Sequence, residues 1–223
     1  MSDSNPVSSA LTYRSIAVTP FQQNCSVVRC NKSGKGCIID PGGDLSQVLD
    51  VVRQMDVQVE KILVTHGHLD HAGQCLALQR ELDVEIYGPH RDDGFWLEAL
   101  ALQGQMMGIE GGEPFVPDHW LEHGEQVRVG ELRFDVIHCP GHTPGHLVFF
   151  DPQSRLAFVG DVLFAGSIGR TDFPRGNLED LLRSIRERLF PLGDDVEFIP
   201  GHGPNSTFGT ERKHNPFVSA SYG

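Results

Sequence analysis

The stretch that decides the fold of this chain is Val64-Thr65-His66-Gly67-His68-Leu69-Asp70-His71-Ala72-Gly73. Three histidines and one aspartate occupy four of the six positions from 66 to 71. The preceding residues 61–65 have the composition of a buried strand, and the residues from 72 onward have the apolar spacing of a helix. The histidines and the aspartate therefore lie on the turn between a strand and a helix, where their side chains can converge on a metal ion.

One such turn can supply ligands to two ions. His66 and His68 can reach one ion, while Asp70 and His71, beyond the bend, can reach a second. Imidazole nitrogens with carboxylate oxygens suit zinc, and a hydrolytic zinc site keeps one position open for water. The alternative is a polar, hydrogen-bonded turn with incidental histidines, since a short motif alone can match by chance.

The pattern His-x-His-x-Asp-His resembles the signature of the metallo-β-lactamase fold superfamily. Three later motifs follow in the order typical of that family: Pro-Gly-His at 140–142, Val-Gly-Asp at 159–161 and Pro-Gly-His-Gly-Pro at 200–204. Four motifs in order disfavour the incidental turn. The resemblance implies seven metal ligands: His66, His68 and His142 for the first ion, Asp70, His71 and His202 for the second, and Asp161 as the bridge between them.

Two bridged ions imply a hydrolytic mechanism. Ions about 3.5 to 4 Å apart can lower the pKa of a shared water towards about 7, which provides hydroxide without a protein nucleophile. We expect two divalent ions, zinc first and iron or manganese as alternatives, with Asp70 and Asp161 as the catalytic carboxylates beside the bridging hydroxide. Ser167 lies in Gly-Ser-Ile-Gly, which is not a nucleophile elbow, and Cys139 and His138 are neighbours in a strand that face opposite sides.

The order of the expected elements is α/β. Extended runs at 24–30 and 37–40 flank a turn-rich segment and should form a hairpin, and Asp44 should cap a helix with apolar residues at 45, 48, 49 and 52. Helices to about residue 82 and at 92–103 and 178–189 alternate with strands at 61–65, 84–87 and 197–200, and hairpins are expected at 126–139 and 147–160. This order agrees with the fold of the resembled family, an αββα sandwich of two mixed sheets flanked by helices.

Bulk composition limits the other possibilities. Residues 1–12 are polar, so we expect a loose tail before a single domain of residues 13–223. A formal net charge of −12 without a basic run disfavours nucleic acid as a partner. Residues 1–10 show no signal-peptide pattern and no apolar run is long enough to span a membrane, so we expect a cytoplasmic protein. We also expect a monomer or a small homo-oligomer. The five cysteines form no Cys-x-x-Cys pair and should be buried, reduced thiols.

A carboxylate at position 161 resembles glyoxalase II and is unlike true metallo-β-lactamases. Together with Asn-Cys-Ser-Val-Val at 24–28, Asp-Pro-Gly-Gly at 40–43 and Gly-Asp-Val-Leu-Phe at 160–164, it is most similar to the bacterial YcbL-type, glyoxalase II-like proteins. The resemblance implies a thioester hydrolase of the hydroxyacylglutathione hydrolase type, with S-lactoylglutathione or a related 2-hydroxyacyl thioester as its small-molecule substrate. The loop at 169–173 also resembles glutathione persulfide dioxygenases, in which the residues corresponding to His66, His142 and Asp161 hold a single iron. That alternative remains open.

Three further residues are candidates for support or substrate contact. Asp40 matches a family position that braces the ligand loop, and it is equally a turn-forming aspartate before proline. His146 can support the ligands or be purely structural. Arg170 matches the cation that holds a glutathione carboxylate in glyoxalase II, although an ion pair with Asp172 is an equal alternative.

The rest of the glutathione site of glyoxalase II has no match in this chain. Its two aromatic positions correspond to Asp172 and Pro204, and we expect no counterpart of its C-terminal helical domain after His202. In the loop expected at 104–119, Met106 and Met107 should pack under the loop rather than edge a pocket. No role is assigned to the five remaining histidines, His90, His119, His123, His138 and His214.

Overall fold

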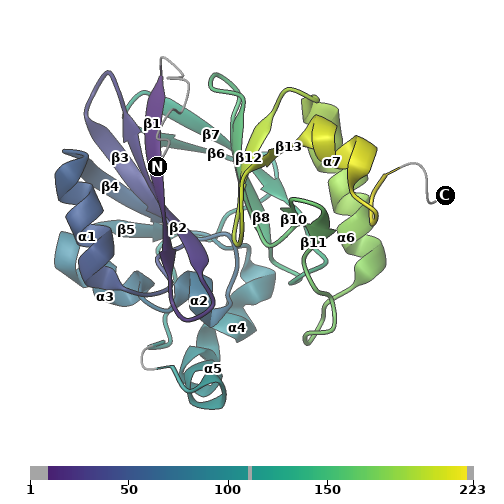
Figure 1. The fold of residues 1–223 in the computed structure, drawn as a ribbon. Coiled ribbons are helices and arrows are strands. Elements are labelled where there is room, and N and C mark those ends of the chain that lie inside the picture. Colours follow the sequence, from purple (N-terminus) through teal and green to yellow (C-terminus); the bar gives the residue numbers. More distant parts are fainter. Residues whose placement is uncertain (1–9, 110–111, 220–223) are drawn as a thin grey trace.

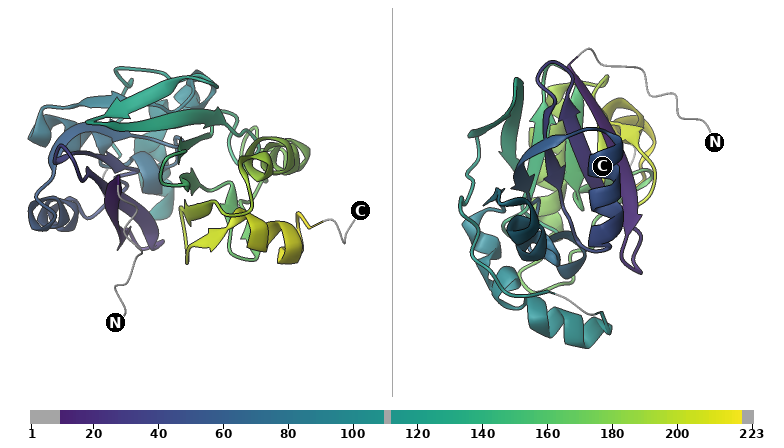
Figure 2. Two further views of the ribbon diagram at one scale, coloured as in Figure 1. Left: turned by 90° about the horizontal axis from the view of Figure 1, so that it is seen from above. Right: turned by 90° about the vertical axis from the view of Figure 1, so that its left-hand side faces the viewer.

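The computed structural model describes residues 10–109 and 112–219. Two β-sheets pack face to face, and helices cover the outer face of each sheet (Figure 1). Seen from above, the helices of the two halves lie on opposite sides of the paired sheets (Figure 2). This arrangement is the predicted αββα sandwich.

The first sheet has the order β1-β2-β3-β4-β5 and is mixed, because β1, β2 and β3 pair antiparallel while β3, β4 and β5 pair parallel. Its strands are β1 (Leu11–Val18), β2 (Gln23–Cys30), β3 (Lys35–Ile39), β4 (Gln58–Leu63) and β5 (Glu85–Tyr87). The parallel pairs require crossover helices, which α1 (Leu45–Gln54) and α3 (Cys75–Leu82) supply. The predicted β2–β3 hairpin is confirmed.

The second sheet has the order β13-β12-β9-β8-β7-β6, in which only the pair of β12 and β9 is parallel. Its strands are β6 (Gln126–Val129), β7 (Leu132–His138), β8 (Leu147–Asp151), β9 (Leu156–Gly160), β12 (Glu197–Pro200) and β13 (Ser206–Thr207). The segment α6 (Leu178–Ser184), η2 (Ile185–Leu189) and η3 (Phe190–Leu192) covers it together with α7 (Phe208–His214). A small ribbon of β10 (Leu163–Phe164) and β11 (Ser167–Ile168) lies beside it.

Apolar side chains fill three layers. Between the sheets, Phe134, Phe149 and Phe158 of the second sheet meet Leu63 and Ile39 of the first. Two further layers lie between each sheet and its own helices. Burying both faces of each sheet explains why strands such as β8 and β9 read as continuous apolar runs rather than as alternating ones.

Several predicted boundaries are wrong. The strand β1 begins at Leu11, inside the predicted tail, while residues 1–9 lie outside the described part of the chain. The helix expected to residue 82 divides into α2 (Leu69–Ala72) and α3, and the one expected at 92–103 divides into η1 (Arg91–Asp93), α4 (Gly94–Glu98) and α5 (Leu100–Met107). Asp44 precedes α1 but its side chain does not cap it, because that carboxylate accepts a hydrogen bond from the backbone N–H of Thr19 instead.

The sheet topology gathers the ends of four strands at one edge. The strands β4, β7, β9 and β12 end at residues 63, 138, 160 and 200, and each is followed by a loop that carries candidate ligands. Since β9 and β12 are parallel, and β7 and β9 both pair antiparallel with β8, these three strands of the second sheet end on the same side. Among the described residues, none of the helices is both long and apolar enough to cross a membrane.

Candidate metal centre

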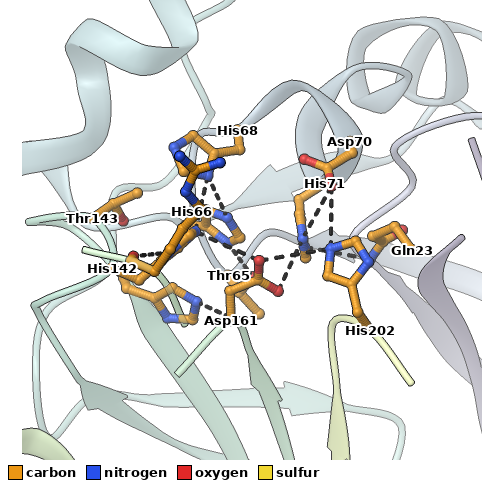
Figure 3. Close-up of polar contacts among 12 residues, drawn as sticks. Gln23, Thr65, His66, His68, Asp70, His71, His142, Thr143, Asp161 and His202 are labelled. Atoms are coloured by element: carbon orange, nitrogen blue, oxygen red, sulfur yellow. Dashed lines mark hydrogen bonds and ion pairs between the residues drawn. The ribbon is translucent and has the colours of Figure 1, made fainter. Parts of the chain in front are cut away.

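The structure brings all seven candidate ligands together between the edges of the two sheets (Figure 3). The loop after β4 contributes four of them, and the loops after β7, β9 and β12 contribute one each. These side chains are His66, His68, Asp70 and His71 from the first loop, then His142, Asp161 and His202. Six of the seven are buried or nearly so, and His202 is the most open, with 29 % of its side chain exposed.

The first group consists of three buried imidazoles. The Nδ1 atom of His68 lies 3.1 Å from Nε2 of His66 and 3.0 Å from Nε2 of His142. Ligands bound to one tetrahedral zinc at about 2.0–2.1 Å lie about 3.4 Å apart, so these three nitrogens need little movement to share an ion.

The second group consists of Asp70, His71 and His202. Asp70 Oδ2 lies 3.2 Å from Nε2 of His202 and 3.9 Å from Nε2 of His71. The group combines two imidazoles with a carboxylate, which is a donor set suited to a divalent transition metal.

Asp161 lies between the two groups. Its Oδ2 is 3.5 Å from Nε2 of His142 and 3.6 Å from Nε2 of His202, and its Oδ1 is 3.3 Å from Nε2 of His71. Gly201 makes this approach possible, because a Cβ atom at that position would lie 2.1 Å from Oδ1 of Asp161. The glycine of the Pro-Gly-His motif is therefore required by the packing of the centre.

The hydrogen-bond partners of the imidazoles fit a centre that binds cations. The Nδ1 atoms of His66, His142 and His202 face the Thr65 hydroxyl at 3.0 Å, the Arg170 carbonyl at 2.7 Å and the Phe21 carbonyl at 3.1 Å. Each oxygen is placed to accept Nδ1–H, so the nitrogen that each ring directs into the centre is Nε2. Nitrogens so close to one another and to carboxylates leave polar atoms unsatisfied. Among the described residues, buried Nε2 of His71 and Oδ1 of Asp161 have no hydrogen-bond partner.

Electrostatics separate the two groups. Burial and the neighbouring imidazoles hold the pKa of His66 well below its usual value and lower the pKa of His68 to about 3, so these rings stay neutral and able to bind metal. Burial also opposes charge on His71, yet the carboxylates of Asp161, Asp70 and Asp40 outweigh it and raise the pKa of His71 well above its usual value. The second group thus favours positive charge, as a proton or as a metal ion.

Asp40 braces the ligand loop from beneath. Its Oδ1 accepts the backbone N–H of Thr65 at 2.7 Å, and its Oδ2 accepts the Thr65 hydroxyl at 2.6 Å and Nδ1–H of His71 at 2.9 Å. Its backbone has a φ of 53°, which aspartate tolerates better than most residues. Asp40 therefore contacts the ligand loop at Thr65 and at His71.

His146 supports two of the candidate ligands. Its Nε2 accepts the backbone N–H of Asp161 at 3.0 Å, and its ring stacks on His66 with the centroids 4.6 Å apart. The side chain is completely buried, and burial holds its pKa well below the usual value, so the ring stays a neutral acceptor. His146 thus positions the centre from behind.

Two buried residues that the sequence did not single out fasten the ligand loops. Asp93 accepts hydrogen bonds from the backbone N–H of Gly67 at 2.9 Å, the hydroxyl of Thr143 at 2.7 Å and the backbone N–H of Gly145 at 2.6 Å. Gln103 on α5 accepts the backbone N–H of Leu69 at 2.9 Å. Neither residue belongs to a motif, so only the folded structure reveals that they hold the ligand loops.

A pocket of about 490 Å³ opens onto both groups. Asp70, Asp161, His68, His142 and His202 form its floor. Its walls are mainly apolar and are formed by Phe21, Met107, Phe164, Ser167, Ile168, Arg170 and Phe173. A substrate in this pocket would meet the candidate ligands at one end and an apolar surface around them.

The backbone carbonyl of Arg170 contacts the centre, whereas its guanidinium binds Asp172. Its carbonyl faces His142, while its guanidinium forms two hydrogen bonds with Asp172, at 2.7 and 2.6 Å, and lies 4.3 Å from the centroid of Phe173. This hydrogen-bonded ion pair lowers the pKa of Asp172 to about 2. The ion-pair alternative is the one found in the structure.

The methionine prediction is wrong for the pocket side of α5. Met107 lines the pocket with 41 % of its surface exposed, and Met106 is 79 % exposed, so neither is packed under a loop. The cause is that α5 extends to Met107, beyond the predicted start of the loop.

The comparisons with known proteins agree with this geometry. The family model of the Metallo-beta-lactamase superfamily matches residues 18–204, a span that contains all the candidate ligands. The hydroxyacylglutathione hydrolase GloC of Haemophilus influenzae is 44 % identical over 206 residues, which cover 92 % of this chain and 97 % of that protein.

Two solved structures are also similar. The B3 metallo-β-lactamase BLEG-1 is 33 % identical with a TM-score of 0.87, over 94 % of this chain and 100 % of that chain. TTHA1623, solved in a di-iron-bound form, is 35 % identical with a TM-score of 0.84, over 92 % of this chain and 100 % of that chain. The motifs, the αββα sandwich, the clustered histidines and aspartates and the matched family model lead to one conclusion. The chain belongs to the metallo-β-lactamase superfamily.

Proposed function

We propose that the protein is a dinuclear, mainly zinc-dependent hydrolase of thioesters, with S-lactoylglutathione or a related 2-hydroxyacyl thioester as its substrate. One observation carries the proposal: Asp161 lies within 3.6 Å of ligand nitrogens from both groups, at the floor of the pocket. The 44 % identity to a hydroxyacylglutathione hydrolase supports this substrate class.

The roles of the side chains follow from their positions. His66, His68 and His142 would hold one ion, Asp70, His71 and His202 the other, and Asp161 would contact both. Two such ions would supply an activated water and a Lewis acid for the carbonyl oxygen. Asp40 and the carbonyls of Phe21 and Arg170 keep the ligand rings in the tautomers that point into the centre.

A thioester suits a pocket floor on which every acidic or basic side chain is a candidate metal ligand. The acidic and basic side chains on the pocket floor are all candidate ligands, so none remains as a general acid for the leaving group. A thiolate leaves without such help because the pKa of a thiol is about 8.5, whereas an amine leaving group needs a proton. The site therefore favours a thioester over an amide.

Recognition of the thiol half should be weak. The charge of Arg170 is already paired with Asp172, and the other pocket walls are mainly apolar. Glutathione carries net negative charge, which the net charge of −12 on the protein does not attract. We propose that the acyl end at the centre determines specificity.

The five buried, free cysteines suit a reducing compartment such as the cytoplasm.

The experiment is hydrolysis of S-lactoylglutathione, followed by thiol release, in wild type and in Asp161→Asn. We expect a loss of at least about a thousandfold in kcat, because one carboxylate serves both groups. Asp151→Asn is the matched control, since Asp151 is also a buried aspartate at a strand end of the second sheet but lies outside the centre. Near-wild-type hydrolysis by Asp161→Asn would refute the proposal.

The alternative, a mononuclear iron glutathione persulfide dioxygenase, makes a different forecast. It would use His66, His142 and Asp161 and leave Asp70, His71 and His202 without a metal. Oxygen consumption with glutathione persulfide, without thioester hydrolysis, would establish it. The 44 % identity to a hydroxyacylglutathione hydrolase over most of the chain supports the hydrolase instead.

A further inference from the structure

Two of the histidines without an assigned role form a second cluster, away from the candidate centre. His90 directly precedes η1, and His138 ends β7. With Asp92 they offer three ligand atoms that all lie within 4.8 Å of one another. This cluster shares no residue with the groups around Asp161.

Both imidazoles are held in the form that can bind a metal. His138 Nε2 lies 2.7 Å from the carbonyl oxygen of Pro144 and must donate to it, which leaves Nδ1 bare. His90 Nε2 lies 2.8 Å from Oε2 of Glu122, so its Nδ1 carries no proton; Nδ1 accepts the backbone N–H of Asp92 at 3.2 Å and lies 3.4 Å from Asp92 Oδ2. A carbonyl or carboxylate on the distal nitrogen is the usual support of a metal-binding histidine.

Two carboxylates and two guanidinium groups lie around the cluster. Asp92 and Glu122 each bring a carboxylate, Arg91 contacts only the far oxygen of Glu122, with its Nε 3.3 Å from Oε1, and Arg188 donates to the backbone carbonyl of His138. The side chain of Asp92 is 55 % exposed, whereas that of His90 is 12 % exposed. An ion could therefore enter from solvent on the Asp92 side and meet imidazoles that are already fixed.

We propose that His90, Asp92 and His138 form an outer site for one divalent ion of the zinc class, with water as a further ligand. Two imidazole nitrogens and one carboxylate are a donor set that zinc prefers. The two rings are now stacked, with centroids 4.3 Å apart and planes 19° apart, so one must rotate for both Nδ1 atoms to face one ion. His90 is the ring that would rotate, because its carboxylate partners are exposed and its Nδ1 would exchange the backbone N–H of Asp92 for the ion, whereas His138 donates to the carbonyl of Pro144.

The position of the outer site gives it a structural role. The backbone N–H of His90 donates to the carbonyl of Gly145 at 3.1 Å, and Asp93 holds the loops of Gly67 and Thr143. An ion bound by His90, Asp92 and His138 would tie η1 to the end of β7 beside both loops. It would stabilise the fold around the centre without taking part in the reaction.

The test is a zinc-binding measurement on the metal-loaded enzyme. Wild type, Asp92→Asn and His138→Gln are dialysed against micromolar free Zn²⁺, and bound zinc and total metal per chain are counted by atomic emission. We expect one more zinc per chain in wild type than in either variant, because each variant removes one of the three ligands. Zinc should also raise the unfolding temperature of wild type more than that of the variants.

His119→Gln is the matched control. His119 also pairs with a carboxylate, Glu85 at 3.3 Å, and stacks on a ring, that of Tyr87, but Tyr87 offers no second imidazole. It should keep the extra zinc. Equal metal counts in wild type and Asp92→Asn, or an equal loss in His119→Gln, would overturn the proposal. Since Asp92 is exposed, its variant should fold even if His138→Gln does not.

Discussion

Asp40 Oδ2 lies 2.9 Å from Nδ1 of His71, and both side chains are buried beneath the candidate centre. This contact fixes the His71 ring so that its Nε2 faces Asp161 and Asp70. A carboxylate on the distal nitrogen also makes the imidazole a stronger donor towards a metal. The second group thus depends on a residue that binds no metal itself.

Asp40→Asn should weaken the second metal by about 10- to 100-fold and leave the first nearly unchanged. The amide keeps the shape of the side chain but presents an N–H group to donors from Thr65 or His71. Metal content after dialysis against a weak chelator measures the effect. Asp56→Asn serves as the control, because Asp56 has a similar φ of 51° but is exposed and remote from the centre. Equal metal retention in both variants would contradict the account.

Arg170→Ala should change kcat/KM for S-lactoylglutathione by no more than about fivefold, because an exposed, paired charge is worth at most about 1 kcal/mol. Asp172→Ala is the informative partner. It frees the guanidinium from its carboxylate and should lower KM for the anionic glutathione thioester but not for a neutral thioester. A large loss in Arg170→Ala would instead show that Arg170 leaves Asp172 to hold substrate.

Asp93 should make stability depend on pH. Burial outweighs its three hydrogen bonds and raises its pKa to about 6, compared with about 3.9 in an unfolded chain. Between about pH 4 and 6 the folded protein binds a proton that the unfolded chain does not, so this contribution is complete below about pH 4 and is lost as pH rises through 6.

The unfolding free energy of wild type minus that of Asp93→Asn should therefore fall by about 2–3 kcal/mol from pH 4 to pH 7. Urea titrations of both proteins with chelator present measure this difference without a contribution from metals. A difference that is constant with pH would show that Asp93 is ionised throughout, held by Gly67, Thr143 and Gly145.

The fold class and the residues that lie together at the centre could both be predicted from the sequence. The reason is local: each motif follows a strand, and strands of this topology end at one edge, so the order of motifs already implies their convergence. His66 stands out in its own histidine-rich turn, whereas His202, far away in the chain, is identified through the resemblance of its motif to the superfamily.

The supporting contacts could not be predicted in the same way. Asp93 and Gln103 lie within helical segments without a motif, and their bonds to the ligand loops exist only after those segments pack. The guanidinium of Arg170 could bind either a substrate carboxylate or Asp172, and in the structure it binds Asp172. For an exposed side chain the partner depends on the nearby charges, which a sequence pattern does not specify. Asp44 likewise bonds to Thr19 rather than to its own helix.

The most direct test of the central claim is a metal titration of activity. Metal-free enzyme carrying Asp92→Asn, which removes the proposed outer site, is titrated with Zn²⁺ while bound metal per chain and hydrolysis of S-lactoylglutathione are followed together. The account predicts that hydrolysis reaches its full rate only as the second ion binds and does not rise further. Full hydrolysis with one ion per chain, or a preparation that holds one iron and consumes oxygen with glutathione persulfide, would contradict it.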